Sequence, residues 1–198
     1  MQLYLFYLIW LLAAYVLGSV SSGALVAKLA GLEIGNLGDG NPGARNVWRQ
    51  IGHKRGLAVF VADFATGAVV TLPLYFLGTP IWMRTLAMVA VLAGHFFPVF
   101  WKFRGGTGGA VGMGTTLGLL PLGVLIAVPV TTGVFVLTRT SIYTMWAFFG
   151  VTLLAGSLLH RDPPAFLAVV LAAMAPVFKW AAHHRIRSVT DVRKWLNR

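Results

Sequence analysis

The stretch Leu37–Arg49, LGDGNPGARNVWR, lies between two apolar segments that are each long enough to cross a membrane. It contains three glycines, two asparagines and two arginines, and a further glycine follows at Gly52. Because glycine has no Cβ, successive backbone N–H groups can converge on one anion. Arg45 and Arg49 carry planar donors that suit phosphate or carboxylate. The stretch therefore predicts a cradle for an anionic group beside a bilayer, and the alternative is a solvated connecting loop.

The composition around this loop is that of a membrane protein. The chain has 198 residues, of which 58% are hydrophobic and only 11% are charged, and its mean hydropathy is +0.78. Soluble domains carry about 25% charged residues. We therefore predict one integral membrane domain over residues 1–198, all-α, built as a polytopic helix bundle. The N-terminus lacks a basic region, so we expect an uncleaved first span rather than a signal peptide.

Charge and residue content exclude several classes of function. The net charge of +11 is what the basic inner loops of a membrane protein produce, so we expect no nucleic-acid partner. The chain has no cysteine, which excludes thiolate nucleophiles, thiolate metal ligands and disulfides. We expect neither a metal site nor a cofactor.

Six apolar segments flank or follow the loop. The segment Leu3–Leu29 precedes it and is long enough for one membrane helix of about 20 residues or more. The small residues within this segment favour close helix packing. Asp63 interrupts the next segment, and an ionisable group at that depth needs a polar cavity or a partner. Asp63 is therefore either a catalytic group or the structural partner of a loop arginine. The five later segments are Gly56–Leu77, Thr85–Phe100, Leu119–Leu137, Ile142–Leu159 and Pro163–Trp180.

A second glycine-rich stretch, FRGGTGGAVGMGTTLG, has seven glycines between Gly105 and Gly118. If Gly105–Leu137 crosses the membrane once, the chain has six spans, and the basic tail lies across the membrane from the basic first loop. If it crosses twice, every lysine and arginine except Arg84 and Arg161 falls on the inside, as the positive-inside rule requires. We therefore predict about seven spans, with the N-terminus outside and the C-terminus cytoplasmic.

The 33 residues of Gly105–Leu137 are too few for two full spans. We therefore expect one short or broken helix that enters at the glycines. Irregular backbone at membrane depth is tolerated only where it lines a cavity. Both glycine-rich loops should then face the same cytoplasmic chamber. The basic tail AHHRIRSVTDVRKWLNR is amphipathic and suits a helix on the membrane surface.

Six motifs in this order are similar to those of the bacterial acyl-phosphate:glycerol-3-phosphate acyltransferases (PlsY): GSVSSG, AKLAG, NLGDGNPGARNVWR, GHFFPVFWKFRGGTGG, TRTS and HHR. The resemblance runs from about Gly18 to the tail, nearly the whole chain. It implies an inner-membrane enzyme that transfers a fatty acyl group from acyl phosphate to the 1-hydroxyl of glycerol 3-phosphate. The product is lysophosphatidic acid, a precursor of phospholipids.

The resemblance also implies a set of site residues. The positions matched as catalytic are Asn46, Arg49, Arg104 and His184. The positions matched as substrate-binding are Gly38, Asp39, Gly40, Asn41, Gly43, Arg45, Gly105, Gly106, Thr107, Gly108, Ser141 and Arg187. From the residues alone, the alternative role of Ser141 is to cap a helix that begins at Ile142.

Several of these positions depart from the family pattern. Asp39 replaces a serine and Arg45 a threonine, and the two new charges are expected to pair. Thr107 replaces a lysine that binds substrate phosphate in the family, while Arg104 keeps a cation next to it. Thr66 replaces another lysine, and Arg187 stands where the family has an active-site asparagine.

The chemistry that the resemblance implies agrees with what the chain lacks. An acyl phosphate is a mixed anhydride with a good leaving group, so no serine or cysteine acyl-enzyme is required. None of the five histidines belongs to an HxxxxD motif, which disfavours the mechanism of the soluble-type glycerolipid acyltransferases. Two alternatives stay open. One is an altered paralogue that binds acyl phosphate or phospholipid, or that uses another acceptor. The other is a lipid or anion transporter, disfavoured because no inverted repeat is evident.

Overall fold

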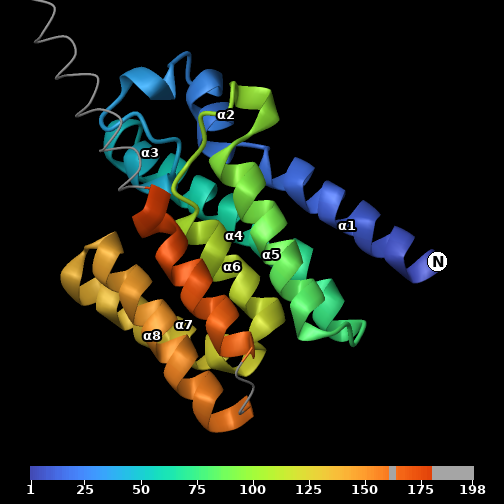
Figure 1. Ribbon diagram of the computed structural model, residues 1–198. Coiled ribbons are helices and arrows are strands. Elements are labelled where there is room, and N and C mark those ends of the chain that lie inside the picture. The colour runs from blue at the N-terminus through green and yellow to red at the C-terminus, as the bar shows by residue number, and fades with distance from the viewer. Residues whose placement is uncertain (161–163, 180–198) are drawn as a thin grey trace, which may run out of the picture.

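The computed structural model describes residues 1–160 and 164–179, and every regular element among them is a helix. The all-α prediction is confirmed. In chain order the elements are α1 (Gln2–Gly18), α2 (Ser22–Leu29), η1 (Ile34–Asn36), α3 (Ala44–Gln50), α4 (His53–Phe76), α5 (Ile81–Phe96), η2 (Val99–Trp101), α6 (Gly109–Leu119), α7 (Pro121–Thr138) and α8 (Ser141–His160). A last helix covers Pro164–Lys179. Figure 1 shows the long helices side by side in one bundle.

The helices are those of a multi-pass membrane protein. Four helical segments of the described chain are long and apolar enough to cross a membrane: Gln2–Leu29, His53–Phe76, Ile81–Trp101 and Pro121–Thr138. Two shorter apolar helical stretches are Ser141–Gly156 and Pro164–Lys179. Together with the short helix α6 they allow the seven spans expected from charge placement, and that number stays a prediction.

The first apolar segment is not the single helix that its composition predicts. Helix α1 ends at Gly18, and α2 begins at Ser22 after a break. Ser21 is the N-cap of α2, because its hydroxyl accepts the N–H of Ala24 at 3.4 Å and so stabilises the start of this second helix. Helix α2 then packs beneath the first glycine-rich loop, where Gly23 lies directly against the carbonyl of Pro42.

Two pairs of helices run parallel and touch through glycine. In α1 and α5, the rings of Tyr7 and Trp82 meet near the start of both helices, and near their ends Gly18 lies against the backbone of Val91 and Gly94 against that of Tyr15. In α4 and α6, Gly67 lies against the Val111 carbonyl, and Gly114 and Gly118 lie against Phe64 and Thr71. Small residues allow such backbone contact between membrane helices. The packing role expected for small residues is confirmed for Gly18.

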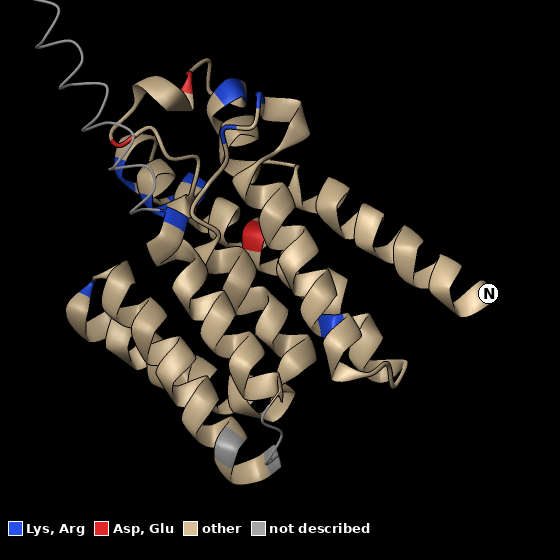
Figure 2. Cartoon of the chain, viewed as in Figure 1, with Lys and Arg blue, Asp and Glu red and all other residues tan. Residues whose placement is uncertain are grey.

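Because α4 and α6 run in the same direction, the loop before each of them lies at the same end of the bundle. This is the end at which α1 and α5 finish, since those helices are also parallel. In Figure 2 most of the described lysines and arginines gather at this end. Both glycine-rich loops therefore lie at one end of the bundle, and the cytoplasmic chamber that they are expected to face stays a prediction.

Helix α6 is the short element predicted from the limited length of Gly105–Leu137. It has 11 residues, begins directly after the glycines, and buries most of its side chains between its neighbours. Its backbone also bonds to α4, since the Thr71 hydroxyl donates to the Thr115 carbonyl at 2.9 Å. At the far end Arg84 donates to the Gly118 carbonyl at 2.9 Å and lies 5.5 Å from the Tyr75 ring centroid.

We expect Gly67→Ala to destabilise the protein. The new Cβ would meet backbone atoms of α6, with the Thr115 nitrogen at 2.8 Å, so the two helices must separate. Overpacking of this kind costs about 1–3 kcal/mol. Thermal melting in detergent, followed by tryptophan fluorescence, should show a lower Tm.

The matched control is Gly133→Ala in α7, where a Cβ meets no atom within 4 Å. It should leave Tm unchanged or raise it, because alanine is the better helix former by about 1 kcal/mol. Equal effects of the two substitutions would contradict the close contact between α4 and α6.

Candidate functional site

The first loop is organised by a buried asparagine. Asn46 is 4% exposed, and its side-chain amide donates to the carbonyls of Leu37 at 2.8 Å and Asn41 at 3.0 Å. Asn41 in turn accepts the N–H of Gly43 at 3.2 Å, and Asp39 accepts the N–H of Asn41 at 3.0 Å. These bonds hold the loop in one shape. Asn46, predicted as catalytic, is thus bonded to the protein's own backbone and positions the loop.

Glycine is required at two turns of this loop. Gly38 and Gly40 have φ of +56° and +73°, in the left-handed region that other residues rarely adopt. Gly38 also lies against the Asn46 and Gln50 side chains, so no side chain fits there. The glycines therefore serve the shape of the loop, and the anion cradle that the sequence predicts stays a proposal.

The two arginines of the loop lie on α3 and are exposed. Arg45 is in the first turn of α3 and Arg49 in its last, and at this spacing they lie on the same face. Exposed guanidinium groups beside an ordered glycine-rich loop are well placed to meet an anion from solution. The ion pair of Arg45 with Asp39 stays a prediction.

The second loop is pressed against the end of α5. The Gly106 N–H donates to the His95 carbonyl at 3.1 Å, and a Cβ on Gly106 would lie 2.5 Å from His95 Nε2. Gly105 lies against the same carbonyl, and Gly108 has φ of +76° and lies against the Phe96 ring. All three glycines are therefore needed for close approach of the loop backbone.

The side chains in this loop differ in exposure. Arg104, at its start, is exposed, and Thr107 is half-buried between Gly106 and Gly108. Gly108 is the N-cap of α6, so the N–H groups of Gly108 and of the first turn of α6 have no partner within the helix. These donors and the nearby cations favour an anion.

A buried polar cluster connects the two loops. The Ser22 hydroxyl donates to Asp63, and the Asp63 carboxylate interacts electrostatically with His95. Ser22 precedes Gly23, which touches the first loop, and His95 faces Gly106 of the second. The partners of Asp63 are thus Ser22 and His95 rather than the loop arginine weighed from the sequence.

Ser22 and His95 were absent from the site residues predicted from sequence. The available signal was their polarity within apolar segments, because polar groups at membrane depth usually have partners. Spacing along the chain could not reveal it, since Ser22 and Asp63 are 41 residues apart.

Three predicted site residues remain, and of these Ser141 alone lies within the described residues. Helix α8 begins at Ser141 itself, so Ser141 lies in its first turn and is exposed. The end of α7 before it lies near α3, with the rings of Phe135 and Trp48 at 6.2 Å. The turn with Ser141 is thus at the end of the bundle that carries the loops. His184, Arg187 and the amphipathic tail lie outside the described residues.

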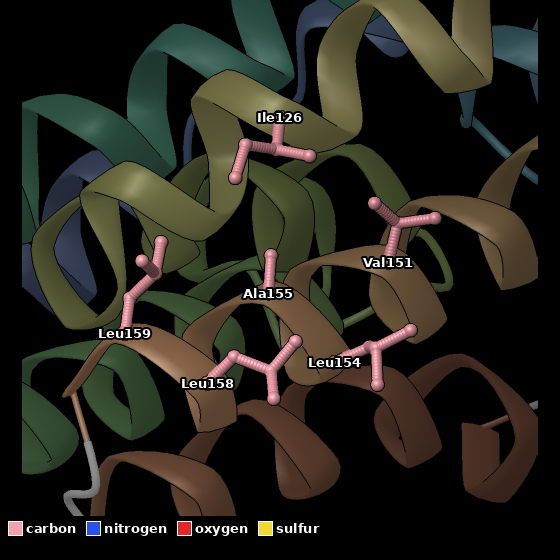
Figure 3. A pocket seen from close by; sticks show the side chains of 6 residues that line it. All are labelled: Ile126, Val151, Leu154, Ala155, Leu158 and Leu159. Atoms are coloured by element: carbon pink, nitrogen blue, oxygen red, sulfur yellow. The ribbon is translucent and has the colours of Figure 1, made fainter.

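An apolar pocket of about 280 Å³ lies between α7 and α8. Figure 3 shows its lining side chains, which are Ile126, Val151, Leu154, Ala155, Leu158 and Leu159. Most of them come from the half of α8 distant from Ser141. Because the lining has no polar side chain, this pocket does not bind the anion that the loops favour.

Comparisons with known proteins agree on one family. A sequence model described as glycerol-3-phosphate acyltransferase matches residues 8–191. The chain is 45% identical over 117 residues to a glycerol-3-phosphate acyltransferase of Geobacter metallireducens, covering 59% of this chain and 60% of the relative. It is 36% identical over 189 residues to the enzyme of Bacillus velezensis, covering 93% and 96% of the two chains.

The fold is similar to that of a solved structure. This is the crystal structure of PlsY (YgiH), an integral membrane glycerol 3-phosphate acyltransferase, in its glycerol 3-phosphate form. The TM-score is 0.78 at 28% sequence identity, over 94% of this chain and 93% of that one. A lysophosphatidic acid form of the same enzyme matches with a TM-score of 0.75.

We expect Asn46→Ala to loosen the first loop. The change leaves the Leu37 and Asn41 carbonyls without their donor, at a cost of about 1–3 kcal/mol. The variant should melt at a lower temperature, and trypsin should cleave it faster after Arg45. Asn36→Ala is the control, because Asn36 is exposed and bonds only to Glu33 among its described hydrogen bonds. Equal cleavage rates in the two variants would refute the role of Asn46.

Proposed function

Because the chain belongs to the glycerol-3-phosphate acyltransferase family, we propose that it acylates the 1-hydroxyl of glycerol 3-phosphate with acyl phosphate as donor. The product is lysophosphatidic acid. The observation that supports this proposal best is the meeting of two glycine-rich loops at one basic end of the bundle, joined by the Ser22–Asp63–His95 cluster. Two substrates that each carry a phosphate need such a site.

The reaction requires positioning more than a protein nucleophile. The glycerol hydroxyl oxygen forms a bond to the acyl carbonyl carbon, and the bond from that carbon to the phosphate oxygen breaks. The hydroxyl proton ends on the released phosphate. The protein must hold two anions together and stabilise the negative charge that develops on the carbonyl oxygen.

We assign the roles by exposure and bonding. Arg49, Arg45 and Arg104 are exposed cations beside the loops and bind the phosphates. The backbone of Gly105–Gly108 approaches the substrate closely, and Thr107 supplies a hydroxyl between two glycines. Asn46 positions the first loop. Ser141 and His184 complete the site by their match to the family, and Arg187 by its place at the position of the family's asparagine.

We also propose the cytoplasmic face of a bacterial inner membrane as the location of the site. The basic residues gather at the end of the bundle that carries the loops (Figure 2), and basic loops stay inside. Acyl chains of the donor and product then lie among the membrane lipids.

We expect the purified protein to release phosphate from palmitoyl phosphate in the presence of glycerol 3-phosphate. Arg49→Ala should lower kcat/KM by the equivalent of about 2–4 kcal/mol, because a charge-assisted phosphate contact is lost. Arg55→Ala, an exposed arginine at the start of α4, is the matched control.

The result separates the alternatives weighed from the sequence. Phosphate release without lysophosphatidic acid would indicate another acceptor. Binding of both substrates without turnover would indicate an altered paralogue, and unchanged kinetics in Arg49→Ala would place Arg49 outside the site.

Topology is tested by reporters fused to the two ends. With seven spans, a periplasmic reporter fused after Met1 should be active, and the same reporter fused after Arg198 should be silent. A cytoplasmic reporter at each position is the control and should give the reverse pattern. Activity of both periplasmic fusions, or of neither, would contradict an odd number of spans.

A further inference from the structure

The loop Gly105–Gly108 has no cation of its own in its buried part. Thr107 is uncharged, and Arg104 is exposed at the start of the loop. A phosphate at this loop is better held if a fixed positive charge faces it, because a charge-assisted hydrogen bond is about twice as strong as a neutral one. The described residues offer such a charge on another element.

Lys179, at the end of the helix Pro164–Lys179, extends to the end of α5. Its ammonium donates to the Phe96 carbonyl at 2.9 Å and lies 4.4 Å from the centre of the Phe97 ring. The side chain is half-buried. A lysine held by a carbonyl and an aromatic face keeps its charge in one place.

The same carbonyl borders the loop. A Cβ on Gly105 would lie 2.8 Å from the Phe96 oxygen, so Gly105 and the Lys179 ammonium both lie close to this one oxygen. One turn earlier in the last helix, Pro176 lies 3.9 Å from the place of a Cβ on Gly109. Lys179 also interacts electrostatically with His95, which faces Gly106. The end of this helix therefore flanks the loop on the side of α5.

The chemistry of the ammonium leaves room for a ligand. Lysine has three N–H donors, and its described hydrogen bonds use one of them, on Phe96. Phosphate oxygens are the preferred acceptors for the others in a site from which water is partly excluded.

We propose that Lys179 is a substrate-binding residue that supplies the positive charge for a phosphate held by the loop Gly105–Gly108. This inference rests on the proposed function for the identity of the ligand, which is a phosphate monoester or an acyl phosphate. Lys179, which is distant from the loop in sequence, thus supplies the charge that Thr107 of the loop lacks.

The first test compares kinetics of the full-length protein in detergent. Lys179→Met keeps the length of the side chain and removes the charge, and it should raise KM about tenfold for the substrate whose phosphate lies at the loop. Separate titrations of glycerol 3-phosphate and palmitoyl phosphate show which one. Lys28→Met, an exposed lysine on α2, is the control and should leave both KM values unchanged.

The second test moves the charge onto the loop. In the double variant Lys179→Met with Thr107→Lys, the new lysine should restore KM to within about threefold of the parent value. Thr107→Lys alone places a second cation at the loop and should lower activity. Restoration is the result that a merely structural role of Lys179 would not produce.

Two outcomes would overturn the inference. One is an unchanged KM for both substrates in Lys179→Met. The other is a fall in Tm that parallels the loss of activity and is not reversed by Thr107→Lys, which would make Lys179 only an anchor for its helix.

The proposed function can fail separately. If the parent protein has no turnover, a rise in Tm with added glycerol 3-phosphate or inorganic phosphate still reports binding. Loss of that rise in Lys179→Met, and its return in the double variant, would support Lys179 without the acyltransferase reaction. An equal rise in Tm with added ligand in the parent and in Lys179→Met would count against the inference.

Discussion

The arrangement of this protein depends on direct contact between helix backbones at glycine. Gly67 and Gly114 bring α4 and α6 together, and Gly18 and Gly94 do the same for α1 and α5. Apolar surface gives helices little reason to associate in lipid, so close packing of small residues provides much of the attraction. Because both pairs are parallel, this packing also determines that the two glycine-rich loops lie at one end.

The second constraint is the cost of polar groups among apolar helices. Asp63 is buried, the Ser22 hydroxyl donates to its carboxylate, and His95 interacts with it electrostatically, so the cluster spans three helices. Removal of the Ser22 hydroxyl would leave the buried Asp63 carboxylate without its described hydrogen-bond donor. Since Ser22 lies under the first loop and His95 against the second, the cluster also sets where the loops lie relative to each other.

An acyl phosphate is already activated, so a site of backbone N–H groups and cations is chemically sufficient for its transfer. Such a site needs rigid loops and charges at defined places, and both are present here. Asn46 stiffens the first loop through two carbonyls, and His95 supports the second. The positive charge is distributed over exposed arginines and the half-buried Lys179. In the role that we propose for Lys179, this distribution compensates for the uncharged Thr107.

Composition and local pattern alone determined the helical membrane class, the shared end of the two glycine-rich loops and the short helix after Gly108, because length and charge placement restrict how a chain crosses a bilayer. The sequence did not reveal the break before Ser22, which follows from capping by Ser21 and the approach of Gly23 to Pro42. Nor did it reveal Lys179, whose contact with Phe96 joins positions 83 residues apart. Only tertiary structure decides such contacts, because the energy of a buried charge depends on which neighbours packing brings to it, whatever their separation along the chain.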